Sequence, residues 1–334
     1  MKNLFSFKYL LISVCVLNFL YSCSKGDSNP VTPTPAPKPD TLTAGWSKIT
    51  FTSPFLSDVV FQNSLVGYVE ASGSIYKSMD GGNTWSKLSK TFYGIKNIAV
   101  TNDGKLFVVG TVDTVYKSTD GGASFSYVAT GKGSLTDIFF SDNNTGYIPF
   151  SNGMLLTTDG GITWAPVIPT TGLSIPTIFD YNSIFFFNSS TGWISVSATS
   201  AVYKTNGNIN SWTKSNIVGI GPFPGILVLF ATSPSVVYLG SGAGNIFKST
   251  DGGANFSVIT TFAPVSHTAY LDLHFIDANV GYASYTTRIY KTVDGGATWT
   301  PVVSLGYEEF VEIHFVDATH GWACTNHGSI LKLN

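Results

Sequence analysis

The chain has 334 residues, of which 43% are hydrophobic, 14% aromatic and 11% charged. That composition supplies a large core and excludes an intrinsically disordered protein. With 18 basic and 20 acidic residues, the chain also lacks the basic excess expected of a nucleic-acid-binding protein.

Residues 1–22 have the features of a secretory signal. Lys2 and Lys8 give a basic start, and residues 9–20 form an apolar segment that is too short to span a membrane comfortably. Leu20-Tyr21-Ser22-Cys23 resembles a bacterial lipobox, in which Cys23 becomes the new N-terminus and carries the lipid. The alternative is a cysteine that happens to lie near an ordinary cleavage site. We expect lipidation of Cys23 and a location in the bacterial cell envelope, lipid-anchored in the outer membrane.

Residues 23–43 are expected to form a plain tether between the lipidated Cys23 and a folded domain. Proline favours extended polyproline II and leaves little to bury in a core. The segment contains Pro30, Pro33, Pro35, Pro37 and Pro39. At roughly 3.1 Å per residue it would hold the domain up to about 60 Å from a membrane. Beyond Cys23 the mature chain keeps only Cys324, so no internal disulfide is available.

From residue 44 to residue 334 the chain repeats an eight-residue pattern, which reads Ser-Met-Asp-Gly-Gly-Asn-Thr-Trp at residues 78–85. An apolar run that ends in an aromatic residue and a lysine precedes it, as in Ile75-Tyr76-Lys77, and predicts a strand. Asp-Gly-Gly predicts a tight turn, because glycine accepts positive φ and aspartate accepts hydrogen bonds from nearby N–H groups. Good copies cover residues 118–125, 157–164, 249–256 and 292–299; a degenerate copy at 205–212 has Gly207 in place of the aspartate.

A second pattern lies upstream of these turns and adds two more strands to each unit. It is clearest at residues 137–147, recurs at 272–282 and 312–322, and is looser at 58–68 and 183–193. Four short strands at a period of roughly 40 to 48 residues match the blade of a β-propeller. The last unit lacks an outer strand, but Gly45-Trp46-Ser47-Lys48-Ile49 resembles Thr84-Trp85-Ser86-Lys87-Leu88. The N-terminal strand is therefore predicted to close the last blade of an all-β, seven-bladed propeller with four-stranded blades.

The pattern Ser/Thr-x-Asp-Gly-Gly-x-x-Trp/Phe resembles the Asp-box, or BNR repeat, of sialidases, sortilin-type receptors and some glycoside hydrolases. The combined pattern is most similar to the seven-bladed propellers of the photosystem II stability/assembly-factor family, over about residues 44–334. The repeat implies a fold and not an activity, because it occurs in enzymes and receptors alike. An arginine-triad sialidase is excluded, since the chain contains one arginine, Arg288. The same shortage weakens any transfer of the arginine patch that is implied in partner binding in the assembly-factor family.

The turn aspartates raise the question of calcium binding or catalysis. They are Asp80, Asp120, Asp159, Asp251 and Asp294. A calcium loop needs several oxygen ligands from one segment, whereas each copy offers a single carboxylate. We therefore expect structural roles for these residues, and the resemblance implies that this turn lies away from the ligand face.

The first strands of the units are expected to lie nearest the propeller axis, where polar residues recur. Aligned positions form a candidate axial ring of Asp58, Asn97, Asp137, Ser183, Leu227, Asp272 and Glu312. The alternative is that these side chains bond the neighbouring backbone and hold the blades together. His274 and His314 lie two places later, and with the nearby carboxylates they would suit a divalent metal. Repeat copying explains their symmetry equally well, so we expect neither a metal nor a cofactor.

The loops that enter each first strand carry aromatic and acidic residues. They give a candidate binding face of Tyr93, Phe179, Tyr181, Tyr270, Tyr307, Glu308 and Glu309. Exposed aromatic rings there would suit sugar stacking or a protein hot spot, although some must fill gaps between blades. Glu308 and Glu309 suggest a hydrolytic carboxylate pair, but neighbours in an extended strand point in opposite directions.

The sequence favours a membrane-anchored, extracytoplasmic propeller that acts as a non-catalytic binding or scaffold protein, with a role in envelope or complex assembly. The alternative is a glycan-binding or glycoside-hydrolase-like protein. The expected partner is an envelope protein or a glycan, with the lipid anchor in the membrane and no nucleic acid.

Overall fold

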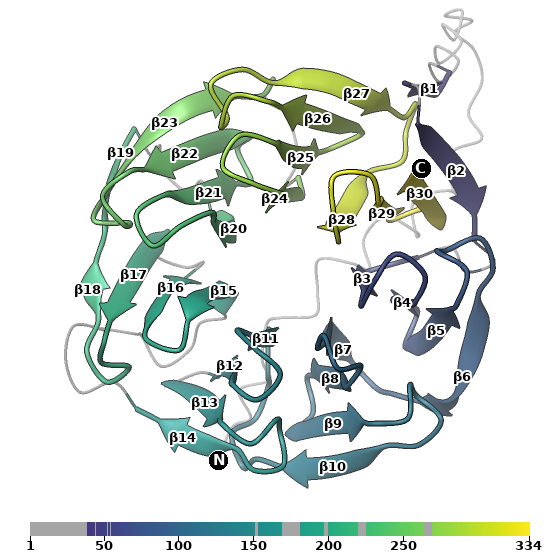
Figure 1. Cartoon of the computed structure of the whole chain (residues 1–334), viewed down its shortest axis with the longest axis vertical. Helices are drawn as coiled ribbons and strands as arrows, with labels where there is room; N and C mark the ends of the chain where they lie inside the picture. Colours follow the sequence, from purple (N-terminus) through teal and green to yellow (C-terminus); the bar gives the residue numbers. More distant parts are fainter. Residues whose placement is uncertain are drawn as a thin grey trace, which may run out of the picture. The chain divides into compact units, whose positions relative to one another are not determined.

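Seven small antiparallel sheets stand around a common axis, each with its first strand next to the axis and its last strand at the rim (Figure 1). This computed structural model describes residues 39–43, 45–51, 53, 55–150, 153–168, 181–196, 200–219, 225–263 and 269–334. They belong to one unit, Lys38–Asn334. They contain 30 strands, and no helix among them is long and apolar enough to cross a membrane. The predicted seven-bladed β-propeller is confirmed.

The blades follow one another along the chain. Blade 1 contains β3 (Asp58–Phe61), β4 (Gly67–Ala71), β5 (Ser74–Ser78) and β6 (Ser86–Thr91). Blade 2 contains β7 (Ile95–Val100), β8 (Leu106–Gly110), β9 (Thr114–Ser118) and β10 (Ser126–Ala129). Blade 3 contains β11 (Phe139–Phe140), β12 (Gly146–Phe150), β13 (Gly153–Thr157) and β14 (Ala165–Val167). Blade 4 contains β15 (Tyr181–Asn188), β16 (Thr191–Val196), β17 (Ala201–Asn206) and β18 (Thr213–Lys214).

The last three blades each involve a segment from elsewhere in the chain. Blade 5 contains β20 (Ile226–Ala231), β21 (Val237–Ser241), β22 (Asn245–Ser249) and β23 (Asn255–Thr261), with β19 (Asn216–Val218) added at its rim. Blade 6 contains β24 (Leu271–Phe275), β25 (Gly281–Tyr285), β26 (Arg288–Thr292) and β27 (Thr300–Ser304), with β1 (Thr41–Leu42) added at its rim. Blade 7 contains β28 (Phe310–Phe315), β29 (Gly321–Thr325) and β30 (Ser329–Leu333), and β2 (Trp46–Thr50) is its outer strand.

The N-terminal strand closes the ring, as predicted. β2 pairs antiparallel with β30 and aligns Trp46 with Leu333 and Thr50 with Ser329. The two added strands were not predicted. β1 pairs antiparallel with β27, and β19 pairs parallel with β23, so the rims of blades 5 and 6 are covered by fifth strands.

The Asp-Gly-Gly turns are built from local hydrogen bonds. Ser78 Oγ accepts from the Gly82 N–H at 2.7 Å and donates to Asp80 Oδ1 at 2.9 Å. Asp80 also accepts from the N–H and the hydroxyl of Thr84, at 2.9 and 2.6 Å. Both glycines need the left-handed region, with φ of 71° at Gly81 and 87° at Gly82. The same arrangement occurs at Asp120, Asp159, Asp251 and Asp294.

Large side chains join each blade to the next at the level of these turns. Trp322 of blade 7 stacks on Phe61 of blade 1 with ring centroids 3.5 Å apart, and its Nε1–H donates to the Gly81 carbonyl at 3.0 Å. A Cβ on Gly82 would lie 3.0 Å from that Nε1, so the second glycine leaves room for the tryptophan of the neighbouring blade. Four other seams contain a stacked pair: Phe107 and Phe140, Tyr147 and Phe186, Tyr238 and Phe275, and Tyr282 and Phe315.

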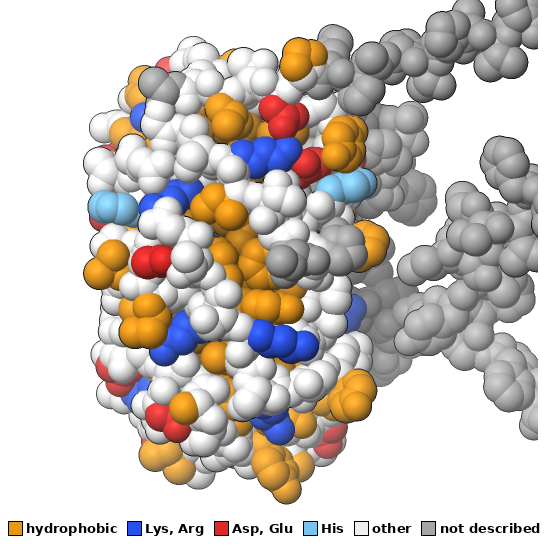
Figure 2. Space-filling model, turned by 90° about the vertical axis from the view of Figure 1, so that its right-hand side faces the viewer, with side chains coloured by type: hydrophobic (Ala, Val, Ile, Leu, Met, Phe, Trp, Pro, Cys, Tyr) orange, Lys and Arg blue, Asp and Glu red, His pale blue; other side chains and the backbone are white. Residues whose placement is uncertain are grey.

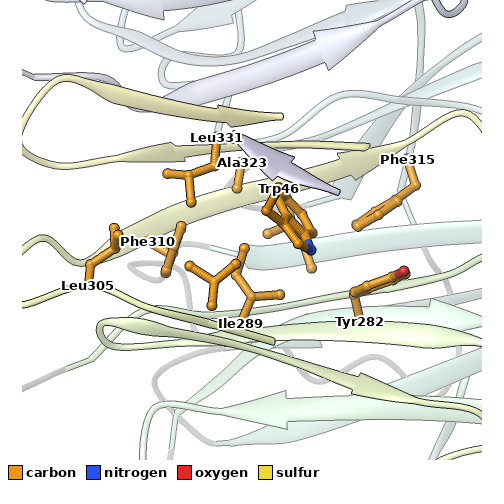
Figure 3. Packing of buried hydrophobic residues seen from close by; sticks show 10 residues of the cluster. Trp46, Tyr282, Ile289, Leu305, Phe310, Phe315, Ala323 and Leu331 are labelled. Atoms are coloured by element: carbon orange, nitrogen blue, oxygen red, sulfur yellow. The ribbon is translucent and has the colours of Figure 1, made fainter. Parts of the chain in front are cut away.

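The core between blades 6 and 7 includes the closing strand (Figure 3). Trp46 of β2 makes edge contacts with Tyr282 of blade 6 and Phe315 of blade 7, with centroids 6.3 and 6.2 Å away. Because Trp46 belongs to the N-terminal strand and its neighbours come from the last two blades, closure and core packing depend on the same side chain.

The rim is mixed in character. Figure 2 shows the side of the propeller that lies at the right of Figure 1, where hydrophobic side chains gather in a strip and Lys and Arg side chains lie along it. β6 is a free outer strand and carries Lys87 and Lys90. Lysines on an edge strand discourage pairing with another chain.

Candidate functional site

The strand order gives the propeller two different ends. Loops that join one blade to the next lie at the end where the inner strands begin, which we call the inter-blade face. The turns between third and fourth strands lie at the opposite end, the Asp-Gly-Gly face. Tyr93, Tyr270 and Tyr307 all lie in loops of the inter-blade face, before β7, β24 and β28.

The inner strands bring the polar residues of the predicted ring together around the axis. Asp58 Oδ2 accepts from the Ile98 N–H of blade 2 at 2.7 Å. The same contact to the following inner strand recurs for Asp137 with Ile184 at 3.0 Å, for Ser183 with Leu229 at 3.3 Å and for Asp272 with Ile313 at 2.8 Å. These side chains therefore bind neighbouring blades together and also line the central cavity.

One member of the ring differs from the sequence alignment. Leu227 was expected at this position in blade 5, but the register of β20 and β21 shifts between Ile226 and Val228. Leu229, the residue after Val228, donates its N–H to Ser183. Val228 therefore occupies the ring position, and it precedes Tyr238 by the same ten residues that separate Asp137 from Tyr147. The axial ring in the structure consists of Asp58, Asn97, Asp137, Ser183, Val228, Asp272 and Glu312.

Two adjoining cavities meet at the axial ring. The axial cavity, of about 360 Å³, is lined by the inner strands of all seven blades from the ring towards the Asp-Gly-Gly face. The mouth cavity, of about 300 Å³, is lined by ring residues together with Leu227, Tyr270, Leu271 and Val311, which precede the ring and approach the inter-blade face. Six ring residues other than Asp58 line both, so the ring is the neck between them.

Burial holds the ring carboxyl groups partly protonated. It raises the pKa of Asp58 to about 8, against the hydrogen bond from Ile98 and with repulsion from Glu70 and Asp137. It raises the pKa of Asp137 and of Asp272 to about 6 in each case. For Glu312, burial and the charge of Asp272 raise the pKa well above the ordinary value. The ring therefore carries less negative charge near neutral pH than four free carboxylates would.

A belt of flat rings follows the axial ring in the axial cavity. Phe139, Phe185, Phe230, His274 and His314 occupy the position two residues after the ring in blades 3 to 7. Their centroids are 5.0, 5.2, 5.1 and 5.6 Å apart in that order. The sequence signal for this belt was present, since each member lies two residues after a ring position, but only its two histidines were singled out.

Both histidines of the belt are neutral. Burial lowers the pKa of His274 to about 3, helped by His314, and lowers the pKa of His314 to about 4. His314 Nε2 lies 3.0 Å from the Phe61 carbonyl, so it donates to the next blade. Within the described ranges, no group of three or more His, Cys, Asp or Glu side chains is arranged to hold a metal ion.

Some residues of the candidate binding face are exposed and others are buried. Tyr93, Tyr270 and Tyr307 are 81%, 50% and 59% exposed. Glu308 is buried; Lys48 donates to its Oε1 at 2.7 Å and Thr325 to its Oε2 at 2.9 Å. Glu309 is half-buried beside Asn326, which donates to it at 3.4 Å. Phe179 and the side chain of Tyr181 lie outside the described residues, as does Cys23.

Lys48 also binds Asp40, which precedes β1. It binds Asp40 Oδ2 at 2.7 Å, and Asp40 Oδ1 accepts from the Gly306 N–H at 3.0 Å. Burial acts to raise the pKa of Glu308, but hydrogen bonds from Lys48 and the neighbouring hydroxyls outweigh it and lower that pKa. Because Gly306 precedes Tyr307, the described chain starts at the inter-blade face beside one of its exposed tyrosines.

The fold is shared with several solved structures. No protein-family profile matches the sequence, and no protein of curated function matches it. The chain is similar to YCF48 bound to D1 peptide, with a TM-score of 0.70 and 18% identity over 90% of this chain and 99% of that one. It is similar to YCF48 from Cyanidioschyzon merolae, with a TM-score of 0.69 and 18% identity over 87% and 99% of the two chains. It also resembles the GH74 xyloglucanase from Xanthomonas campestris, with a TM-score of 0.68 and 17% identity over 86% of this chain and 53% of that one.

Proposed function

We propose that this protein is a non-catalytic binding propeller that holds a polypeptide partner on its inter-blade face. The observation that carries the proposal is the position of Tyr270, which is half exposed and lines the mouth cavity. Tyr93 and Tyr307 are exposed in equivalent loops. Tyrosine supplies a large, rigid contact area with a polar end, which is why it is enriched at the centres of protein interfaces.

The carboxyl groups that could serve in hydrolysis are already held by hydrogen bonds and an ion pair, which favours a binding protein over a hydrolase. A glycoside hydrolase needs two carboxyl groups that face one bond from opposite sides. Glu308 is held by Lys48 and Thr325, and Asp137 and Asp272 accept backbone N–H groups of the next blade. YCF48, whose propeller has a similar fold, binds a D1 peptide, which is a precedent for a polypeptide ligand on this fold.

We further propose that a lipid on Cys23 anchors the protein in the bacterial cell envelope, in the outer membrane. Between Cys23 and Asp40 there are 16 residues, which reach about 50 Å when extended. Asp40 itself is bound by the N–H of Gly306, the residue before Tyr307. A partner that is itself in or near the membrane would then be within reach. Cys23→Ala should release the protein from the membrane fraction, and lipid-dependent attachment of that variant would contradict the anchor.

The partner is tested by cross-linking and affinity capture with the mature protein in its own membrane. Tyr270→Ala and Tyr307→Ala should each reduce the captured partner by about tenfold, as expected for hot-spot residues. Tyr127→Ala is the matched control, because Tyr127 is 69% exposed but lies on the outer strand β10. Equal loss in all three variants, or capture that no tyrosine affects, would contradict the proposed face.

A glycan ligand is the second candidate, because exposed tyrosine rings also stack on sugars. The fold is shared with a GH74 xyloglucanase, of which this chain spans about half. A glycan array tests it with the same variants. Specific binding of one glycan class that is lost in Tyr270→Ala and kept in Tyr127→Ala would favour the glycan over the polypeptide.

A further inference from the structure

We infer that the mouth cavity receives the alkylammonium end of a lysine side chain from the partner, with the ammonium group at the axial ring and its methylene stem in the mouth cavity. The inference rests on the proposed function, because it names what the partner inserts into the inter-blade face.

Asp137 and Asp272 of the ring have unused acceptor capacity. Asp272 Oδ1 accepts from the Leu273 N–H and Oδ2 from the Ile313 N–H, each at 2.8 Å. Asp137 repeats this pattern with Ile138 at 2.8 Å and Ile184 at 3.0 Å. A carboxylate oxygen has two lone pairs, so these four oxygens can accept four further hydrogen bonds, one of which Asp272 receives from Glu312. An ammonium group brings three donors and no acceptor, which suits such a set.

A second, independent observation lies behind Asp272. Ser284 pairs directly with Asp272 between β24 and β25, so both side chains leave the same face of the blade. Ser284 is 0% exposed, and its Oγ has no hydrogen-bond partner in the described part of the chain. Buried hydroxyl groups normally have partners. The second strand of blade 6 therefore leaves one hydroxyl group unsatisfied next to Asp272, although Ser284 itself lines neither cavity.

The charge of the cavities points to a cation. The carboxyl groups that face the neck are Asp58, Asp137, Asp272 and Glu312, and Glu70 and the buried Cys324 lie behind them on the second strands. His274 and His314 of the belt are neutral. Neither cavity has a Lys or Arg among the described residues that line it. The described cavity walls thus offer no positive charge to the ring, whose carboxyl groups are neutralised only in part by protonation, and an incoming cation would supply that charge.

The size and the walls suit an alkyl chain that ends in the charge. The two cavities hold about 300 and 360 Å³, which lies at the small end of ligand sites. Leu227, Leu271 and Val311 give the mouth an apolar wall for methylene groups. Beyond the ring, Phe139, Phe185 and Phe230 line the axial cavity, and aromatic rings attract a cation at close range.

The first test uses n-butylammonium as the probe, with n-butanol as its uncharged counterpart. Titration of the mature protein, followed by NMR and calorimetry, should show butylammonium binding with a Kd of roughly 1 to 10 mM, as expected for so small a ligand, and no binding of butanol. Asp272→Asn and Asp137→Asn should each weaken binding by about tenfold. Asp277→Asn is the control, because this exposed residue lies on the Asp-Gly-Gly side of the same blade as Asp272.

Proton release gives a readout that a purely structural role would not change. The ring carboxyls have raised pKa values, so a bound cation should lower them and release protons. Calorimetry at pH 7 in two buffers of different ionisation enthalpy should detect that release, and it should decrease in Asp272→Asn. Binding of butanol as tight as that of butylammonium, no binding of either, or preferential binding of calcium at the neck would each overturn the inference.

The second test separates this inference from the proposed function and from a free polyamine. Acetylation of lysines in the membrane extract, before capture with the unmodified propeller, should abolish partner capture. If capture depends on Tyr270 but survives acetylation and Asp272→Asn, the binding face stands and the lysine inference fails. If acetylation has no effect while spermidine binds tightly, the ligand is a free polyamine and the inference also fails.

Discussion

Asp58 has two opposing effects on the propeller. Its carboxyl group accepts the Ile98 N–H and so joins blades 1 and 2. Its burial, however, raises the pKa to about 8, so the folded state resists ionisation of this group at a pH where the unfolded chain ionises freely. In blade 2 the same ring position is held by Asn97, which cannot ionise. Asparagine is therefore already present at one position of the ring, and it would remove the cost of ionisation at Asp58.

We expect Asp58→Asn to stabilise the protein at pH 8 and to change little at pH 4. A folded-state pKa above the unfolded value means that stability is full below about pH 4 and is lost as the pH rises towards about 8. The asparagine oxygen still accepts from Ile98, and the gain at pH 8 should be on the order of 1 to 3 kcal/mol. Urea unfolding at both pH values measures it. A variant less stable than the parent at pH 8 would show that the contact with Ile98 outweighs the ionisation effect.

The pKa of Asp80 is shifted in the opposite direction from that of Asp58. Hydrogen bonds from the Thr84 hydroxyl and N–H lower its pKa to about 2, with a further bond from Ser78. The carboxylate therefore contributes stability above about pH 4 that is lost as the pH falls towards 2.

Asp80→Ala should lower Tm by roughly 2 to 5 °C at pH 7, and the difference from the parent protein should shrink as the pH approaches 2. Thermal unfolding by circular dichroism checks this, with capture of the partner as the control. A variant of unchanged Tm that has lost the partner would contradict a structural role for this turn.

At the scale of the strand and the turn, the seams depend on one large side chain reaching the next blade. Trp322 donates to the Gly81 carbonyl of blade 1 from a fully buried position, whereas Trp299 donates to Gly296 within its own turn and is half-buried. Both bonds come from an indole N–H. They differ in whether they join two blades.

We expect Trp322→Phe to lower the free energy of unfolding by about 1 to 3 kcal/mol, because it leaves the buried Gly81 carbonyl without this donor. The aromatic contact with Phe61 remains possible. Trp299→Phe is the matched variant and should cost less than about 1 kcal/mol, since Trp299 is itself only half-buried and its bond lies within one turn. Urea unfolding of both variants measures the two losses in free energy of unfolding. Equal losses would mean that the bond between two blades stabilises the fold no more than the bond within one turn.

The elements that could be predicted from sequence are those whose signal is local and repeated. Asp-Gly-Gly fixes a turn, and the aromatic residues on either side mark two strands, so four strands per blade and closure by Trp46 were predictable. β1 and β19 were missed because they have two and three residues and are stabilised only by the distant strands β27 and β23. The position of Val228 was also predictable, because Val228 precedes Tyr238 by the ten residues that separate Asp137 from Tyr147; the alignment that gave Leu227 was one residue out.

The candidate site was harder to predict, because its properties arise where several blades meet. The alignment found the acidic ring, and the recurrence of His274 and His314 at one position drew attention to the belt. The exposure of Tyr270 at the mouth and the capture of Glu308 by Lys48 depend on the packing of neighbouring loops. A single glutamate pair in the sequence could not show that one member is buried in an ion pair.

At the scale of the whole molecule, the N-terminal segment makes two separate connections. β1 and Asp40 attach to the rim of blade 6 and to Gly306, whereas β2 completes blade 7. Only β2 closes the ring, and its Trp46 is buried in the core between the last two blades (Figure 3). Leu42 of β1 is only partly buried against that core. The two connections should therefore differ sharply in their effect on stability, although they are adjacent in the chain.

A protein that begins at residue 43 should remain a cooperatively folded propeller with a Tm lower by a few degrees, because it loses β1 and the contacts of Asp40 but keeps β2. A protein that begins at residue 51 should lose cooperative unfolding and self-associate, since it leaves β30 as an unpaired edge and removes Trp46 from between Tyr282 and Phe315. Differential scanning calorimetry and size-exclusion chromatography measure both. A synthetic peptide of residues 43–51 added to the shorter protein should restore part of the transition, because it supplies the missing strand. If the shorter protein were as stable and as monomeric as the longer one, closure by β2 would not be what holds the seven blades in a ring.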